Sequence, residues 1–412
     1  MYIERIEVKN FKSFEKLELE LGNFNVVIGP NASGKTNFIH IFEFLRDIIN
    51  FGLDNAISLQ GGTEYIRNMK IRTTRDLSLR VTFSQPQLQD EEPPVTFLRS
   101  GERLRAVKVE YEFRLRFDEK GPLYRVVKDE LKQKYSIYRK KGAQMDVTLK
   151  VFRKNEKLDY QIEPPDTEYK KIIEYMFPFL LREKERKVQG NSLLIETPVF
   201  SFLTPLGNIF REIAIYDFDP RLPKRAIPIT AKAELEENGQ NLPIVVKNIL
   251  ENERNRKKFL NLVRELLPFV ESLDIEKLVD KSLLFKIREN YFEDYIPAPL
   301  ISDGTINIIA LVLVLYLEKK RLIIIEEPER NIHPYLISKI VDMMKDASRE
   351  KQIVVTTHNP EFVKYAGLNN LLFAFRDEKG FSRIERPANK EEIKVFLENE
   401  IGIDELYVQN LL

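Results

Sequence analysis

The sequence predicts an α/β fold that carries an antiparallel β subdomain and a helical insertion. Two unalternating apolar runs, "LIII" and "IVV", are typical of parallel strands that are covered on both faces, and "NFNVVIG" also predicts a buried strand. From Leu77 to about Ile162, apolar and polar residues alternate with a period of two, which indicates antiparallel strands. Between about Tyr169 and Phe285 the apolar spacing is mainly helical.

The order of these patterns divides the chain into three parts. We expect residues 1–163 to form an N-terminal lobe with the β subdomain, residues 164–290 the mainly helical insertion, and residues 291–412 a C-terminal lobe. In the first lobe, "MYIERIEVKNF" and "FEKLELEL" alternate and predict half-exposed strands, whereas "NFIHIFEFLRDII" has helical spacing. A chain of 412 residues is long enough for one large domain with an insertion or for two domains.

The composition excludes several classes of protein. Lys and Arg number 65 and Asp and Glu 64, so the net charge of +1 provides no global attraction for nucleic acid, although a local basic groove stays open. The absence of cysteine rules out disulfides and cysteine zinc sites. The charged N-terminus is unlike a signal peptide, and the run from Ile306 to Leu317 is shorter than the about 20 residues that span a bilayer. We therefore expect a cytoplasmic protein without a membrane partner.

The strongest motif is "GPNASGKT", from Gly29 to Thr36, which matches G-x-x-x-x-G-K-[ST] between a β-branched strand and an amphipathic helix. Backbone N–H groups of such a loop cradle phosphates at a helix N-terminus. Lys35 would reach the β- and γ-phosphates, and the Thr36 hydroxyl would ligate Mg²⁺. The sequence thus predicts a P-loop NTPase that binds ATP and Mg²⁺; the alternative is a glycine-rich turn that binds nothing. The residues expected to contact the nucleotide here are Gly29, Asn31, Ser33, Gly34, Lys35, Thr36 and Asn37.

Two further motifs follow buried strands. "LIIIEEPE" delivers Glu326 and Glu327 to the carboxyl end of a strand, where α/β sheets bind ligands. One carboxylate would hold Mg²⁺, and the next would polarise the attacking water as a general base. "VVTTHNP" places His358 just past another strand, within reach of a γ-phosphate or the water. Taken alone, a solvated acidic turn and a loop histidine would explain both motifs, but a complete P-loop favours the catalytic interpretation.

The stretch "LISDGTINII" begins a helix with polar, turn-like residues. The Ser302 hydroxyl is a suitable helix cap, and the exposed N–H groups of the first turn would form a second anion site. Local chemistry by itself indicates only an ordinary cap.

Five motifs in this order resemble an ABC-type ATPase head of the RecF and structural-maintenance-of-chromosomes (SMC) group: "IEVKNFKSF", "GPNASGKT", "SDGT", "IIIEEPERNIHP" and "VVTTHNP". Within that group the chain is most similar to stand-alone ATPases related to the OLD (overcoming lysogenisation defect) nucleases. The resemblance covers roughly residues 1–70 and 295–365. It implies roles for individual residues: Lys12 and Ser13 near the nucleotide, Ser302, Gly304 and Thr305 in the signature motif, Glu326 as the Walker B acid on the metal, Gln60 as a Q-loop candidate on the metal, and Lys35, Glu327 and His358 in catalysis.

In such heads, two subunits sandwich two ATP molecules between the P-loop of one and the signature motif of the other. The resemblance therefore implies an ATP-dependent homodimer that hydrolyses ATP and gates a DNA-acting partner in DNA repair or phage defence. Only 54 residues follow His358, too few for the TOPRIM domain of OLD nucleases, so we expect nuclease activity to come from a partner chain. A non-catalytic nucleotide-dependent scaffold and the ATPase subunit of a transporter stay open, although the long spacing between P-loop and signature argues against the transporter.

Overall fold

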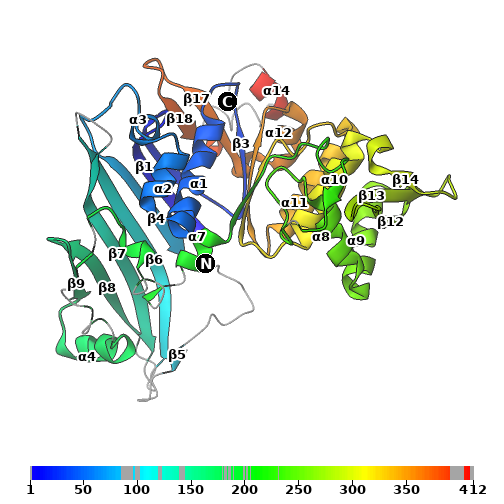
Figure 1. The fold of residues 1–412 in the computed structure, drawn as a ribbon. Coiled ribbons are helices and arrows are strands. Elements are labelled where there is room, and N and C mark those ends of the chain that lie inside the picture. The colour runs from blue at the N-terminus through cyan, green and yellow to red at the C-terminus, as the bar shows by residue number, and fades with distance from the viewer. Residues whose placement is uncertain are drawn as a thin grey trace. The chain divides into compact units, whose positions relative to one another are not determined.

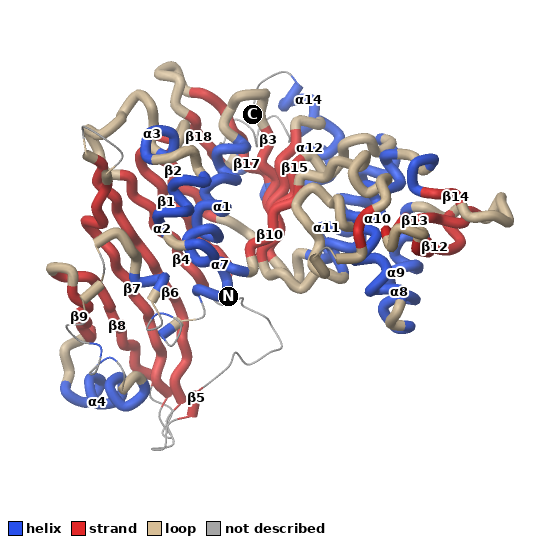
Figure 2. The backbone as a smooth tube through the Cα atoms, viewed as in Figure 1, coloured by secondary structure: helices blue, strands red, loops and turns tan. Residues whose placement is uncertain are grey.

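The computed structural model describes residues 2–84, 96–97, 103–118, 123–138, 144–178, 180, 183, 187–188, 190–197, 200, 203–204, 206–230, 232–389 and 403–408 (Figures 1 and 2). The chain divides into two compact units. Unit 1 comprises Met1–Gly22, Ala32–Ile213 and Ala374–Glu385, and unit 2 comprises Asn23–Asn31, Ala214–Phe373 and Arg386–Leu412. The boundary between them passes through the "GPNASGKT" loop.

Unit 1 contains the antiparallel β subdomain that the alternating pattern predicts. Its sheet has the order β2-β1-β4-β6-β7-β8-β9, every neighbouring pair is antiparallel, and β5 pairs with β6. In β4, Leu77, Leu79 and Val81 are buried and the residues between them are half-buried, as expected for a sheet with one covered face. The strands are β1 (Tyr2–Phe11), β2 (Phe14–Glu20), β4 (Leu77–Ser84), β5 (Thr96–Phe97), β6 (Arg103–Phe117), β7 (Tyr124–Tyr138), β8 (Gln144–Lys154) and β9 (Lys157–Glu163).

Helix α1 (Lys35–Phe51) follows the "GPNASGKT" loop and packs on this sheet. The Phe44 ring lies 6.0 Å from the ring of Phe11 in β1 and 6.2 Å from that of Phe113 in β6. The helical spacing of apolar residues that predicts α1 is therefore the spacing of its buried face. The other helices of unit 1 are α2 (Leu53–Leu59), α3 (Thr63–Ile66), α4 (Thr167–Met176), α7 (Leu206–Arg211) and the 3₁₀ turn η1 (Leu194–Glu196).

A sheet of order β10-β15-β16-β3-β17-β18 contains the apolar runs that predict parallel strands. The pairs β15–β16, β16–β3 and β3–β17 are parallel, and all five residues of β3 are buried. The apolar run after Leu300 forms α10, a helix buried on all sides from Thr305 to Leu315, which explains why it lacks a polar face. The elements are β3 (Phe24–Ile28), β10 (Ile213–Tyr216), β15 (Leu322–Glu326), β16 (Gln352–Thr357), β17 (Leu371–Arg376), β18 (Ser382–Glu385), α10 (Asp303–Tyr316), α11 (Ile337–Ala347), α12 (Pro360–Ala366) and α14 (Ile403–Val408).

The expectation that residues 164–290 are mainly helical is wrong in the last part of that segment. Helices α8 (Leu242–Leu250) and α9 (Glu253–Leu266) are present, but β12 (Val270–Lys277) and β13 (Ser282–Glu289) follow and pair antiparallel. Pro268 lacks an N–H group, so α9 cannot continue into "FVESL", and these residues find partners in β13 instead. The three-part division of the chain stays a prediction. The remaining short elements are β11 (Ile227–Pro228), β14 (Ile296–Pro297), η2 (Ala298–Leu300), η3 (Pro334–Leu336), η4 (Leu368–Asn370) and η5 (Pro387–Asn389).

Over the part of the chain that the structure describes, no helix combines the length and the apolar character that crossing a membrane requires.

Candidate functional site

Gly34, the last residue before α1, lies where no other residue fits. Its φ angle is 114°, in the region that side chains disfavour. A Cβ atom at Gly34 would lie 2.2 Å from Ser382 Oγ and 2.8 Å from Ser382 Cβ, closer than atoms approach. Glycine is therefore required at position 34, because the Ser382 side chain of β18 lies directly against its backbone.

The loop residues before α1 are held by the 374–385 segment of unit 1. Arg376 Nε donates to the Ala32 carbonyl oxygen at 2.8 Å, and Ser382 Oγ donates to the Ser33 carbonyl oxygen at 2.6 Å. The backbone N–H of Ser382 donates to the Ser13 carbonyl oxygen at 3.0 Å. The Ser33 side chain is buried, and its hydroxyl has no hydrogen-bond partner among the described residues. A buried hydroxyl without a partner is costly, and a phosphate oxygen would satisfy it.

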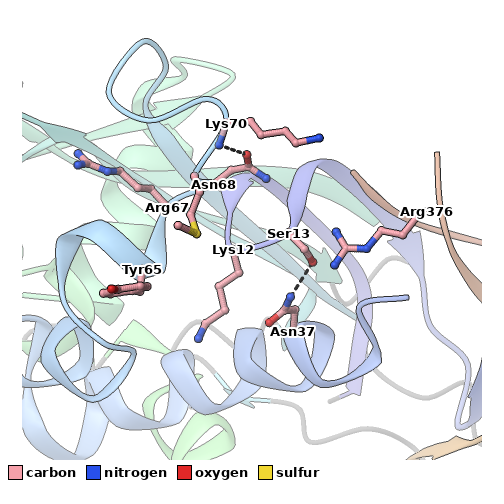
Figure 3. A pocket seen from close by; sticks show the side chains of 9 residues that line it. Lys12, Ser13, Asn37, Tyr65, Arg67, Asn68, Lys70 and Arg376 are labelled. Carbon is pink, nitrogen blue, oxygen red and sulfur yellow. Dashed lines mark hydrogen bonds between the residues drawn. The ribbon is translucent and has the colours of Figure 1, made fainter. Parts of the chain in front are cut away.

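A cavity of about 380 Å³ lies beside the start of α1 in unit 1 (Figure 3). Lys12, Ser13 and Asn37, three residues that the sequence places near the nucleotide, line it together, and Asn37 Nδ2 donates to Ser13 Oγ at 2.8 Å. Four lining residues are Lys or Arg and none is Asp or Glu, so the cavity suits an anion. The full lining is Lys12, Ser13, Asn37, Tyr65, Arg67, Asn68, Met69, Lys70 and Arg376.

Burial affects two titratable groups near this cavity. It lowers the pKa of Lys12, because desolvation disfavours the ammonium form, while Glu43 acts in the opposite direction. Burial and the neighbouring Lys12 lower the pKa of His40 to about 4, so this imidazole is neutral at neutral pH. The charge that faces the cavity therefore comes from Lys and Arg, and a bound phosphate would offset the desolvation of Lys12.

Sequence reasoning missed Arg67, Lys70 and Arg376 as candidates for this cavity. The segment "YIRNMK" does combine an aromatic residue with two cations, which is the only signal that the sequence offers. One contact that holds the segment here is a hydrogen bond from the Lys12 N–H to the Ile66 carbonyl oxygen, 2.8 Å long. Gln60, the Q-loop candidate, follows α2 and is absent from the cavity lining; its buried side-chain oxygen has no hydrogen-bond partner among the described residues. Its assignment as a metal ligand stays a prediction.

In unit 2, two of the three catalytic candidates lie side by side. Glu327 follows β15 and His358 follows β16, and these strands are parallel neighbours with Glu326 opposite Thr356. His358 Nδ1 lies 3.0 Å from Glu327 Oε1. Glu327 has a φ angle of 42°, and its N–H donates to the Thr356 carbonyl oxygen at 2.9 Å. The structure thus brings together a carboxylate and an imidazole that are separated by 31 positions in sequence.

Two neighbouring residues that sequence reasoning missed support this pair. The Arg330 guanidinium contacts Glu327 Oε2 at 3.1 Å. The buried Glu329 carboxylate accepts a hydrogen bond from the Thr357 hydroxyl, which in turn accepts one from the Asn359 N–H at 2.9 Å. Burial raises the pKa of Glu329. The Glu329–Thr357 contact therefore holds the loop that carries His358. Both residues stand in the quoted motif "EEPER", but their roles depend on tertiary contacts.

The signature candidate "SDGT" begins α10. Ser302 caps this helix as expected: its Oγ accepts from the Thr305 N–H at 3.1 Å and lies 2.8 Å from Thr305 Oγ1. A Cβ atom on Gly304 would lie 2.4 Å from the Asn331 carbonyl oxygen. Gly304 is therefore needed for packing of α10 against the loop after Glu327, whatever contact this helix start makes with a nucleotide.

The two groups of candidates lie in different units. Unit 1 holds Lys12, Ser13 and the loop from Ala32 onward, while unit 2 holds Gly29 and Asn31 together with Glu326, Glu327, His358 and the signature residues. No cluster of three or more His, Cys, Asp or Glu side chains that suits a metal was found over the described residues. Mg²⁺ in nucleotide sites takes one or two protein ligands and completes its shell with phosphates and water. A hydroxyl such as that of Thr36 and a carboxylate such as that of Glu326 have the oxygen chemistry that Mg²⁺ requires.

Comparison with known proteins places the chain in a family. A family model described as "AAA domain, putative AbiEii toxin, Type IV TA system" matches residues 24–364. Endonuclease GajA of Bacillus cereus is 21% identical over 405 residues, which is 92% of this chain and 59% of GajA. A DNA replication and repair protein RecF of Lactobacillus johnsonii is 34% identical over 94 residues, or 20% of this chain and 24% of RecF. An OLD nuclease of Thermus scotoductus is 30% identical over 71 residues, or 14% of this chain and 13% of that nuclease.

The chain spans less than two thirds of the length of each of these relatives. The family model, in contrast, covers most of the chain, from β3 with the P-loop that follows it to α12 beyond His358. The chain therefore belongs to the family described as "AAA domain, putative AbiEii toxin, Type IV TA system", and it is of the ABC-type, RecF- and SMC-like class of P-loop ATPases that is related to the OLD proteins.

Proposed function

We propose that this protein binds ATP with Mg²⁺ at its P-loop and hydrolyses it. One observation supports this most directly. Within unit 2, the neighbouring strands β15, β16 and β3 run parallel, and they are followed by Glu327, His358 and Gly29. The carboxyl ends of parallel strands form the edge at which α/β sheets bind ligands. The start of the P-loop, a carboxylate and an imidazole therefore share that edge.

Each group has a role in this proposal. The buried Ser33 hydroxyl, Lys35 and the cavity cations around Lys12 bind and orient the phosphates. Glu327 accepts the proton of the attacking water, and His358 orients the carboxylate. Thr36 and Glu326 would hold Mg²⁺, which supplies charge neutralisation at the phosphates when bound. Gly29 and Asn31 belong to the loop that surrounds the nucleotide, and Asn37 lies in the first turn of α1.

The Lys35→Ala variant tests nucleotide binding. We expect the Kd for ATP to rise by about 10- to 100-fold, because one charge-assisted contact to phosphate contributes about 1.5–3 kcal/mol. Calorimetric titration with ATP and Mg²⁺ measures this change. Lys339→Ala, at an exposed position of α11, is the matched control and should bind as the wild type does. Equal affinity in both variants would remove the P-loop from nucleotide binding.

The wider role in this proposal rests on the relatives. Because GajA is an endonuclease and RecF a DNA replication and repair protein, we infer that the ATPase dimerises on ATP and gates a DNA-acting partner in DNA repair or phage defence. The competing hypothesis of a non-catalytic scaffold predicts nucleotide binding without turnover. Steady-state phosphate release with and without duplex DNA distinguishes the two.

The Ser302→Arg variant tests the dimer. We expect ATP binding by the monomer to persist but ATP-dependent dimerisation to be lost, because a bulky cation would occupy the position next to the partner's nucleotide. Light scattering coupled to size exclusion, with ATP present, measures the mass. This substitution also removes the cap of α10, which costs about 0.5–2 kcal/mol. The Ser302→Ala variant removes only the cap, so it should still dimerise. If the Ser302→Arg variant loses ATP binding as a monomer, the proposed ATP-dependent dimer is contradicted.

A further inference from the structure

We propose that Arg330 is a positioning residue for Glu327 and that Asp217 is its second anchor. This inference rests on the proposed function, since it assigns Glu327 to hydrolysis. Arg330 Nη2 lies 3.1 Å and Nε 3.4 Å from Glu327 Oε2, and Arg330 Nη1 lies 2.9 Å from Asp217 Oδ1. The guanidinium therefore bridges two carboxylates, and one of them is the proposed general base.

The bridge joins the ends of two neighbouring strands. Asp217 directly follows β10 and Glu327 directly follows β15, and these strands are adjacent in the sheet. A guanidinium is planar and presents five donors in a fixed fork, so contacts on two sides define its orientation. Arg330 Nη1 also donates to the Phe218 carbonyl oxygen at 3.4 Å. Groups that follow β10 therefore hold one side of the Arg330 guanidinium, and its other side contacts Glu327.

With Arg330 in place, each oxygen of the Glu327 carboxylate has a charged or polar partner. His358 Nδ1 lies 3.0 Å from Oε1, and the Arg330 guanidinium contacts Oε2. Glu327 also has a backbone φ of 42°, which is unusual for a residue with a side chain. Rotation of the carboxylate requires breaking at least one charge-assisted contact, and this limits its freedom.

The backbone of Arg330 is fixed as well. Its N–H donates to the Glu327 carbonyl oxygen at 3.0 Å, and its carbonyl oxygen accepts from Asn307 Nδ2 at 2.7 Å. Asn307 is buried in α10, and Gly304 of the same helix packs against the Asn331 carbonyl oxygen. The helix that begins at the signature candidate therefore sets the place from which Arg330 reaches Glu327. In this arrangement Arg330 acts through the Glu327 carboxylate, so its loss should lower kcat and leave KM unchanged.

The test compares R330M, R330K, D217N and the double variant D217N/R330M in steady-state ATP hydrolysis. For R330M we expect kcat to fall by about 10- to 100-fold, as a small misplacement of a catalytic group does, with KM and the Kd for ATP unchanged. R330K should recover part of the lost kcat, because it keeps the positive charge. Recovery should be incomplete, because an ammonium does not bridge two carboxylates as the guanidinium does. D217N should lower kcat less than R330M does, and it should cause no further loss of kcat when R330M is already present. R349M is the matched control, because Arg349 is an exposed arginine just after α11 that pairs with Asp346.

Three results would overturn the inference: a kcat of R330M within about twofold of the wild type, a rise in Kd for ATP with kcat unchanged, or independent, additive losses from D217N and R330M. If R330M fails to fold, as judged by thermal melting, D217N decides, and a normal kcat for D217N overturns the proposal. The E327Q variant separates this inference from the proposed function. If the wild type does not hydrolyse ATP, the proposed function is wrong, and if E327Q turns over as the wild type does, Glu327 is not the general base. An inactive E327Q beside a normal R330M means that only the role of Arg330 is wrong.

Discussion

Replacing Glu327 by Gln is expected to slow ATP hydrolysis by about 10²- to 10⁴-fold, the usual contribution of a general base. The amide has nearly the shape of the carboxylate and its oxygen can still accept a hydrogen bond from Arg330, so the local geometry should survive. The amide cannot take up the proton of the attacking water. ATP binding should therefore persist, and the ATP-bound dimer should accumulate. Phosphate release under single-turnover conditions measures the chemical step.

The matched control for this variant is Glu350→Gln, an exposed glutamate after α11 that lies in unit 2 as well. It carries the same change of charge and should leave kcat close to that of the wild type. Unchanged hydrolysis by the Glu327 variant would show that another group activates the water. A loss of ATP binding would instead show that Glu327 contributes to the nucleotide site itself, which the contacts with His358 and Arg330 do not predict.

The second large effect is expected for Gly34→Ala. A Cβ atom at this position would lie 2.2 Å from Ser382 Oγ and 2.8 Å from Ser382 Cβ, and rotation of the serine relieves only the first overlap. The backbone φ of 114° adds strain for any residue with a side chain. Overpacking of this kind lowers the free energy of unfolding by about 1–3 kcal/mol. It should also shift the P-loop backbone just before α1. We expect a lower melting temperature and loss of measurable ATP binding.

A second substitution separates the two causes. In Gly34→Ala/Ser382→Gly the overlap disappears while the disfavoured φ remains, so Gly34→Ala should destabilise the protein less in the Ser382→Gly background than in the wild type. Differential scanning calorimetry of the four proteins in this cycle gives the coupling. Equal destabilisation in both backgrounds would assign the whole effect to backbone strain. A stable single variant with normal ATP binding would contradict the contact between Gly34 and β18.

Much of the fold is predictable because periodicity reports burial directly. The alternating pattern of Leu77 to Ile162 corresponds to strands β4 and β6–β9, and the apolar runs around Val26 and Ile324 correspond to buried parallel strands. The prediction fails after α9. There the spacing of "FVESL" is compatible with a helix, and only Pro268 and the pairing of β12 with β13 decide that it is a strand.

The candidate site shows the same division. Glu327 and His358 are predictable because each follows a buried strand, and parallel neighbours bring their ends together. The cavity cations Arg67 and Arg376 are not predictable. Arg376 reaches the Ala32 carbonyl oxygen across 344 positions of sequence, and no local pattern encodes such a contact. Arg330 lies only three residues from Glu327, but its bridge to Asp217 depends on the order of strands in the sheet.

By itself, the sequence determined the class of this protein, the position of its P-loop and the chemical types of its catalytic candidates, because each of these depends on short motifs and on periodicity along a single element. Only the tertiary structure decided which distant groups meet: Ser382 against Gly34, Asn331 against Gly304, and Arg330 between Glu327 and Asp217. The physical reason is that close packing and ion pairing depend on distances in space. Those distances are set by strand order and helix packing, which local sequence patterns do not specify.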